Sequence, residues 1–181
     1  MLMLMAAFVL IDGSLLAVCS VFAALVHELS HLLALHILGK KIRSLSALGK
    51  GLALRTELLS YRDEAIVCAA GPLASLLLAG GAFVFGFSRI AFASFALFFL
   101  NVLPIYPLDA GRALFCLVSL KTESRVATRI VRAVSFIFLL PLSVLSVIIL
   151  LRSGFNLSLL IICIYLLILQ TGAFNIYESN P

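Results

Sequence analysis

Long apolar stretches separated by short polar ones organise this chain. A transmembrane helix needs about 20 predominantly apolar residues, and four stretches meet or approach that length. They are residues 14–38, 65–87, 90–103 and 133–151. A fifth stretch covers residues 157–174, and the opening stretch, residues 2–11, is short for a full span and counts as a marginal sixth. The pattern predicts an all-α polytopic membrane protein with about six transmembrane segments.

The polar loop after the apolar stretch 14–38, which is the second segment in chain order, has a different pattern. Its sequence, KIRSLSALGKGLALRTELL, alternates apolar and polar side chains in places around Gly49 and Gly51. Such alternation on both sides of glycines is typical of two strands joined by a turn. We therefore expect a short β-hairpin at the membrane surface. Further along, Pro72 is expected to bend or interrupt its apolar helix, and Pro141 is expected to kink the apolar segment 133–151.

The composition agrees with a membrane protein. Hydrophobic side chains make up 64% of the 181 residues, against roughly 45–50% in soluble domains. No polar region is long enough to build a core of its own, so we expect residues 1–181 to form a single membrane-embedded domain. The four cysteines stand singly in apolar runs and are interpreted as small buried hydrophobes.

Basic residues indicate how the chain is oriented. The net charge is +5, and eleven of the thirteen lysines and arginines fall within residues 40–62 and 112–132. The other two, Arg89 and Arg152, lie in short turns on the opposite side. Because positive loops remain in the cytosol, we expect a multi-pass protein with both termini cytosolic. Few aromatic residues accompany the basic ones, so no nucleic-acid partner is predicted.

Three ionisable side chains interrupt the second apolar segment in the stretch HELSH. On a helix, His27 and His31 share one face, and Glu28 lies about 100° round from His27. Two imidazoles can thus bind one metal ion while the carboxylate reaches the water beside it, as in the HExxH pattern. Ionisable residues in a membrane span are rare and usually functional. His36 points to the opposite side of this helix and is left out of the site.

A catalytic zinc ion takes three protein ligands and keeps a fourth position open for water. The candidates for the third ligand are Asp12 and Asp109. Asp109 is favoured, since Arg112 and the basic stretch after it place that end of the fourth segment at the cytosolic side. Lys40 places the end of the HELSH helix at the same side, so the active site is expected towards the cytosol.

The residues around Asp109 suggest irregular backbone. Pro104 and Pro107 break the helix before it, and such backbone is tolerated at membrane depth only where it is buried or lines a wet cavity. The amide of Asn101 could hydrogen-bond a metal ligand, the water or a peptide substrate, or it could satisfy backbone groups freed by Pro104. Asp109 could alternatively act only as an ionic partner of Arg112.

HELSH, followed by GPLASL and NVLPIYPLDAGR, resembles the site-2 protease family of intramembrane zinc metalloproteases, peptidase family M50. The hallmarks of this family are HExxH, a Gly-Pro segment and N-x-x-P-x-x-P-x-D-G, and the resemblance covers about residues 14–120. It implies that His27, His31 and Asp109 bind Zn2+, that Glu28 is the general base, and that Asn101 supports the scissile peptide.

An HExxH motif in the second of six segments resembles the branch that includes the stage IV sporulation protease. Members of that branch commonly carry a CBS domain after the last span, whereas only a few residues follow Phe174 here, so we expect a protein without that domain. Ala110 replaces the usual glycine after the aspartate, which would matter if that position needed a positive φ.

The predicted activity is hydrolysis of a peptide bond in or near a transmembrane segment of a membrane-tethered protein, such as a pro-sigma or other transcription factor. The expected partners are this substrate and the lipid bilayer, and a regulatory membrane protein could be a further partner. The alternative is a membrane metal-binding protein or metal permease that uses the same histidines and aspartate. A permease has no need of Glu28, and the paired repeats of many transporters are not seen in the sequence.

Overall fold

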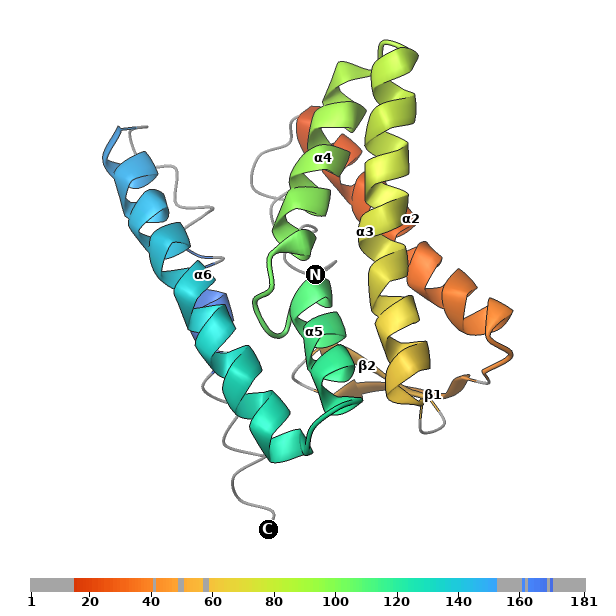
Figure 1. Cartoon of the computed structure of the whole chain (residues 1–181). Coiled ribbons are helices and arrows are strands. Elements are labelled where there is room, and N and C mark those ends of the chain that lie inside the picture. The colour runs from red at the N-terminus through yellow and green to blue at the C-terminus, as the bar shows by residue number, and fades with distance from the viewer. Residues whose placement is uncertain are drawn as a thin grey trace. The chain divides into compact units, whose positions relative to one another are not determined.

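The computed structural model describes residues 15–40, 42–48, 51–56, 59–152, 161, 163–168 and 170. Figure 1 shows the elements in chain order. They are α2 (Leu15–Ile37), β1 (Ile42–Leu48), β2 (Gly51–Thr56), α3 (Tyr61–Val84), α4 (Ser88–Val102), α5 (Asp109–Ser119) and α6 (Ser124–Arg152). The marginal segment at residues 2–11 lies outside the described residues, and the segment at 157–174 is described only in part.

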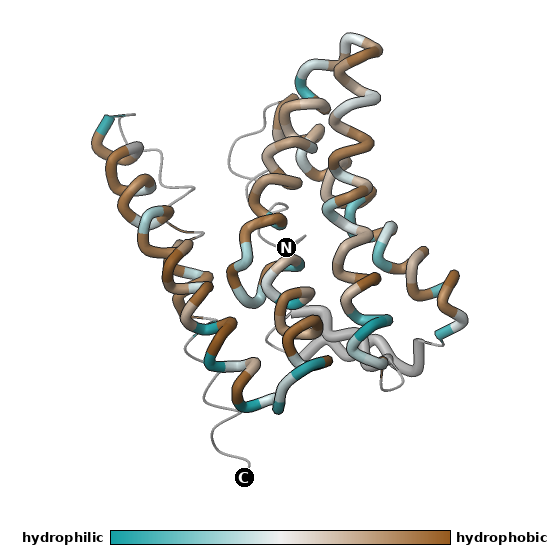
Figure 2. The backbone as a smooth tube through the Cα atoms, in the orientation of Figure 1, coloured by the Kyte–Doolittle hydropathy of each residue, from teal (hydrophilic) through white to brown (hydrophobic). Residues whose placement is uncertain are grey.

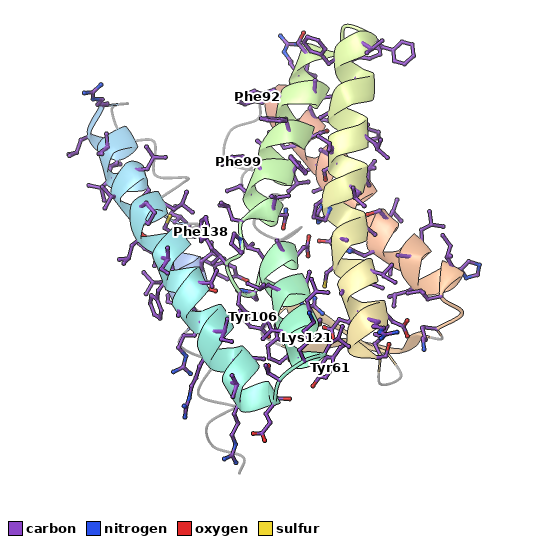
Figure 3. The ribbon with its side chains drawn as sticks, viewed as in Figure 1. Tyr61, Phe92, Phe99, Tyr106, Lys121 and Phe138 are labelled. Atoms are coloured by element: carbon purple, nitrogen blue, oxygen red, sulfur yellow. The ribbon has the colours of Figure 1, made fainter. Side chains whose placement is uncertain are left out.

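Most residues along the long helices are hydrophobic, as the brown colour of the backbone in Figure 2 shows. Among the described residues, α2, α3 and α6 are long and apolar enough to cross a membrane, and α4 is a shorter apolar helix. Phe92 and Phe99 project from one side of α4 (Figure 3), and both are more than half exposed. Large exposed apolar residues on membrane-length helices are suited to contact with lipid. The polytopic helical fold is confirmed, while the number of six spans stays a prediction.

The chain consists of two compact units, residues 1–102 and 103–181. In the first unit, α2, α3 and α4 pack against one another. Small residues at their contact, Ala23, Ala24 and Ala93, surround the fully buried Leu97. Small side chains let helix backbones approach closely, which is how helices associate in lipid, where apolar burial supplies no driving force. This close packing sets α3 directly beside the HELSH segment of α2.

The predicted hairpin is present between α2 and α3. Strands β1 and β2 pair antiparallel, and Leu48 lies opposite Gly51 at the turn. A salt bridge of 3.0 Å joins Lys40 Nζ, just before the hairpin, to Asp63 Oδ2, just after it. Ser60 caps α3, since its Oγ accepts a hydrogen bond of 3.2 Å from the Asp63 N–H. The end of α2 and the start of α3 are therefore tied together where the hairpin leaves the helices.

Both prolines inside the apolar segments lie within continuous helices. Helix α3 passes through Pro72 and α6 passes through Pro141. Of the two outcomes expected at Pro72, an interruption is therefore excluded, because loss of one backbone hydrogen bond within a long apolar helix is not enough to end it. A bend at Pro72 and a kink at Pro141 stay predictions. By contrast, α4 ends at Val102, ahead of Pro104 and Pro107, as the sequence predicted.

Candidate active site

Helix α2 carries all three ionisable residues of HELSH on continuous helical backbone. His27 is buried, while Glu28 and His31 are partly buried. His36 lies in the last turn of α2 and is exposed. The helical geometry expected for the motif is therefore present, with the two histidines one turn apart on a face turned into the first unit.

The two imidazoles are arranged as ligands of one ion would be. His27 Nε2 and His31 Nε2 are 3.2 Å apart, and the rings meet edge-on with centroids 4.9 Å apart. Two nitrogen ligands on a tetrahedral zinc ion, each about 2.0–2.1 Å from the metal, are separated by about 3.3 Å. The donor type and the spacing of this pair therefore fit zinc.

Helix α3 contacts both rings from one face. His31 Nδ1 lies 2.7 Å from the backbone oxygen of Val67, and His27 Nδ1 lies 2.9 Å from Ser75 Oγ. Between them, Gly71 packs so closely that a Cβ at its position would lie 2.7 Å from His27 Cε1 and would overlap the His31 ring. The role of Gly71 in the Gly-Pro segment is therefore steric, since it makes room for the histidine pair.

Sequence reasoning did not identify Ser75 or the carbonyl of Val67 as part of the site. A signal existed for Ser75, because it is a polar residue four positions after Gly71 in an otherwise apolar stretch. A helix places residues separated by four on the same face, so the Gly-Pro motif itself pointed to that serine. The Val67 contact uses a backbone atom and has no side-chain signal in the sequence.

Asn101 lies near the end of α4 and is almost fully buried. Its Nδ2 donates a hydrogen bond of 2.9 Å to the backbone oxygen of Leu97. A proline at position 104 frees the carbonyl of Leu100, four residues earlier, so this bond is not the one expected if Asn101 compensated for Pro104. The bond uses one of the two amide N–H groups and fixes the direction of the side chain.

In the second unit, Asp109 is the first residue of α5 and is partly buried. An acidic side chain in the first turn is favoured by the positive end of the helix dipole. The loop before it is anchored by the N–H of Tyr106, which donates a hydrogen bond of 2.9 Å to Ser135 Oγ on α6. Ile105 is fully buried and packs against Leu139. Both contacts fix the backbone that carries the carboxylate.

The position in this motif that requires glycine is Gly111 and not Ala110. Ala110 lies within α5 and has helical backbone, so it needs no glycine. Gly111 is the position that does, because a Cβ there would lie 2.5 Å from the Ile105 oxygen and 2.5 Å from the Tyr106 nitrogen. The loop before Asp109 folds back across the first turn of α5, and only a residue without a side chain leaves room for it.

The fold and the histidine pair define a multi-pass membrane protein with a candidate metal site inside a membrane helix. Comparison with known proteins shows the family directly, since residues 1–122 match the Peptidase M50B-like family model. The chain belongs to this peptidase family, and the resemblance identified from its motifs is confirmed.

The known proteins similar to this chain include a curated relative and a solved structure. Stage IV sporulation protein FB of Bacillus subtilis (strain 168) is 30% identical over 154 residues, which cover 78% of this chain and 54% of the relative. The chain thus spans about half the length of that relative. The Site-2 Protease from Methanocaldococcus jannaschii is 19% identical, and its structure matches with a TM-score of 0.65 over 91% of this chain and 82% of the other. At this identity the match shows a shared fold.

Proposed function

We propose that this protein is an intramembrane zinc metalloprotease that hydrolyses a peptide bond in or near a transmembrane segment of a membrane-tethered substrate. The observation that carries the proposal is the histidine pair, with Nε2 atoms 3.2 Å apart, in a membrane helix of a Peptidase M50B-like chain. Glu28 follows the first histidine directly, which is the position that a general base takes in the HExxH pattern.

Three residues would hold the zinc ion: His27, His31 and Asp109. The spacing of the histidines supports the first two, and the N-x-x-P-x-x-P-x-D motif supports Asp109. The firm anchoring of the loop before α5 also supports Asp109, because a ligand must hold its position for tight binding. When bound, zinc lowers the pKa of a water molecule to about 7 and polarises the scissile carbonyl.

Side chains of the protein carry out proton transfer and substrate binding. The Glu28 carboxylate accepts a proton from the attacking water and then donates it to the departing amine nitrogen, which makes it both base and acid. Asn101, already oriented by its bond to Leu97, supplies an amide that hydrogen-bonds the scissile peptide. Apolar helices around the histidines limit the entry of bulk water, which strengthens these interactions.

The substrate must present an extended segment, since a helix hides its carbonyls in its own hydrogen bonds. Among the described residues β1 and β2 form a two-stranded sheet, and an extended segment can add to the edge of such a sheet as a further strand. The relative from Bacillus subtilis is named as a sporulation protein, which favours a membrane-associated pro-sigma or other transcription factor as the substrate. The two basic stretches support an active site and both termini on the cytosolic side.

Removal and return of the metal tests this function. Purified full-length protein in detergent micelles should cleave a membrane-tethered candidate substrate, lose activity after treatment with a zinc chelator, and regain it when zinc is added back. Candidate substrates are identified first by co-expression with membrane-tethered transcription factors. Cleavage that persists after the protein has been stripped of metal would contradict the proposal.

A further inference from the structure

We propose that α3 carries a histidine-positioning face, made of the Val67 carbonyl, Gly71 and Ser75, which holds both imidazoles with Nε2 directed to the metal. These three positions follow one another at intervals of four residues, so they form one stripe along α3. The inference rests on the proposed zinc site but concerns binding of the ion, and it can be tested without hydrolysis.

The contact with Val67 determines which nitrogen of His31 carries the proton. A backbone carbonyl can only accept a hydrogen bond, so the 2.7 Å contact requires a proton on His31 Nδ1. In the neutral ring, the lone pair then resides on Nε2, which is the form that binds a metal. The carbonyl thereby selects the metal-binding tautomer of His31.

Ser75 is the corresponding partner of His27, but its hydroxyl, unlike a carbonyl, can either accept or donate a hydrogen bond. Its hydroxyl is almost fully buried and lies 2.9 Å from Nδ1 of a ring that is itself 3% exposed. In the proposed arrangement the hydroxyl accepts a hydrogen bond from Nδ1–H, which leaves the His27 lone pair on Nε2. Two lone pairs then face each other at 3.2 Å, an arrangement that repels in the absence of a cation and that a cation relieves. The histidine-positioning face thus directs both Nε2 lone pairs to one point, where a metal ion can bind them.

Gly71 adds a steric condition to these two hydrogen bonds. A Cβ at position 71 would overlap the His31 ring and come within 2.7 Å of His27 Cε1. Contacts below about 3 Å between carbon atoms are strongly repulsive. A larger residue at position 71 must therefore push the rings apart or turn them away from their Nδ1 partners.

The test measures zinc affinity with a competing chromophoric chelator, using purified full-length protein without substrate. Groups that hydrogen-bond a ligand's second nitrogen typically contribute about 10–100-fold to metal affinity, so Ser75→Ala should weaken zinc binding by that factor. Gly71→Ala should weaken it more, because both rings are displaced.

Two matched variants control for the substitutions themselves. Ser94→Ala removes another buried serine of the first unit, whose hydroxyl has no hydrogen-bond partner among the described residues. Gly80→Ala adds a methyl group on the same helix where no described atom lies within 4 Å. Both should bind zinc like the wild type. Wild-type affinity in Ser75→Ala, or equal losses in the test and control variants, would overturn the proposal.

Nitrogen NMR of the histidine rings in metal-free wild-type protein gives a readout that does not depend on any variant. In the neutral form of each ring the proton should lie on Nδ1 of His27 and of His31, and Ser75→Ala should change the tautomer of His27 alone. A dominant Nε2–H form of either ring in the wild type would overturn the proposal. If zinc binding depends on Ser75 but the protein has no peptidase activity, the proposed function fails while the positioning proposal stands.

Discussion

His27 and His31 place polar rings inside a helix that is otherwise suited to lipid. A polar group without a partner in an apolar environment costs several kcal/mol, so such residues are retained only where something offsets that cost. Here each ring has a hydrogen-bond partner on α3 for Nδ1, at 2.9 Å and 2.7 Å. The remaining Nε2 atoms meet each other at a spacing that a metal ion fits. In the proposed function, a metal ion bound at Nε2 would satisfy the nitrogen of each ring that has no partner on α3.

The role of Asp109 can be tested by a substitution that keeps its shape. Asp109→Asn replaces a carboxylate by a neutral amide, which is a poorer zinc ligand, so zinc affinity should fall by about 10-fold or more. Excess zinc should partly restore cleavage, because the other ligands and Glu28 are intact. Zinc titration and cleavage assays on the same preparation check this. Unchanged zinc affinity would remove Asp109 from the ligand set.

The loop that leads into α5 depends on one glycine. Gly111→Ala places a methyl group 2.5 Å from the Ile105 oxygen, so the loop must shift, and overpacking of this kind typically costs about 1–3 kcal/mol. We expect a lower unfolding temperature and reduced cleavage. The control is Ala110→Gly, whose cost should be only about 0.5–1 kcal/mol, because it merely loosens a helix turn. Thermal unfolding in detergent compares the two, and equal effects would contradict the close approach at Gly111.

For single helices, the sequence predicts the features that local patterns determine. The spacing of His27 and His31 places both on one helix face, and Pro104 marks the end of α4. The contacts of α3 with the histidines were beyond such reasoning, because His27 and Ser75 are 48 residues apart and meet only through the packing register of two helices. At Pro72 the sequence left a bend and an interruption open, and the helix continues because the length of the apolar segment outweighs one lost hydrogen bond.

For the whole molecule, the distribution of basic residues predicts the orientation in the membrane. Single cysteines replacing Lys50 and Arg125, in a background without the four native cysteines, should be protected from membrane-impermeant thiol reagents in intact cells. Both positions lie in the basic stretches that are expected in the cytosol. A cysteine at Arg89 should label readily, because the start of α4, where this residue lies, is expected on the other side. The reverse pattern at these sites would invert the orientation.

The central claim is that HELSH is the catalytic motif of a zinc peptidase, and Glu28→Gln measured for zinc content and cleavage together tests it most directly. Glutamine keeps the shape of the side chain but cannot accept a proton from water, so cleavage should fall by at least about 10²–10⁴-fold. Zinc content should stay at about one ion per chain. His36→Ala, at the exposed end of the same helix, should leave both quantities unchanged. Wild-type cleavage by Glu28→Gln would contradict the account.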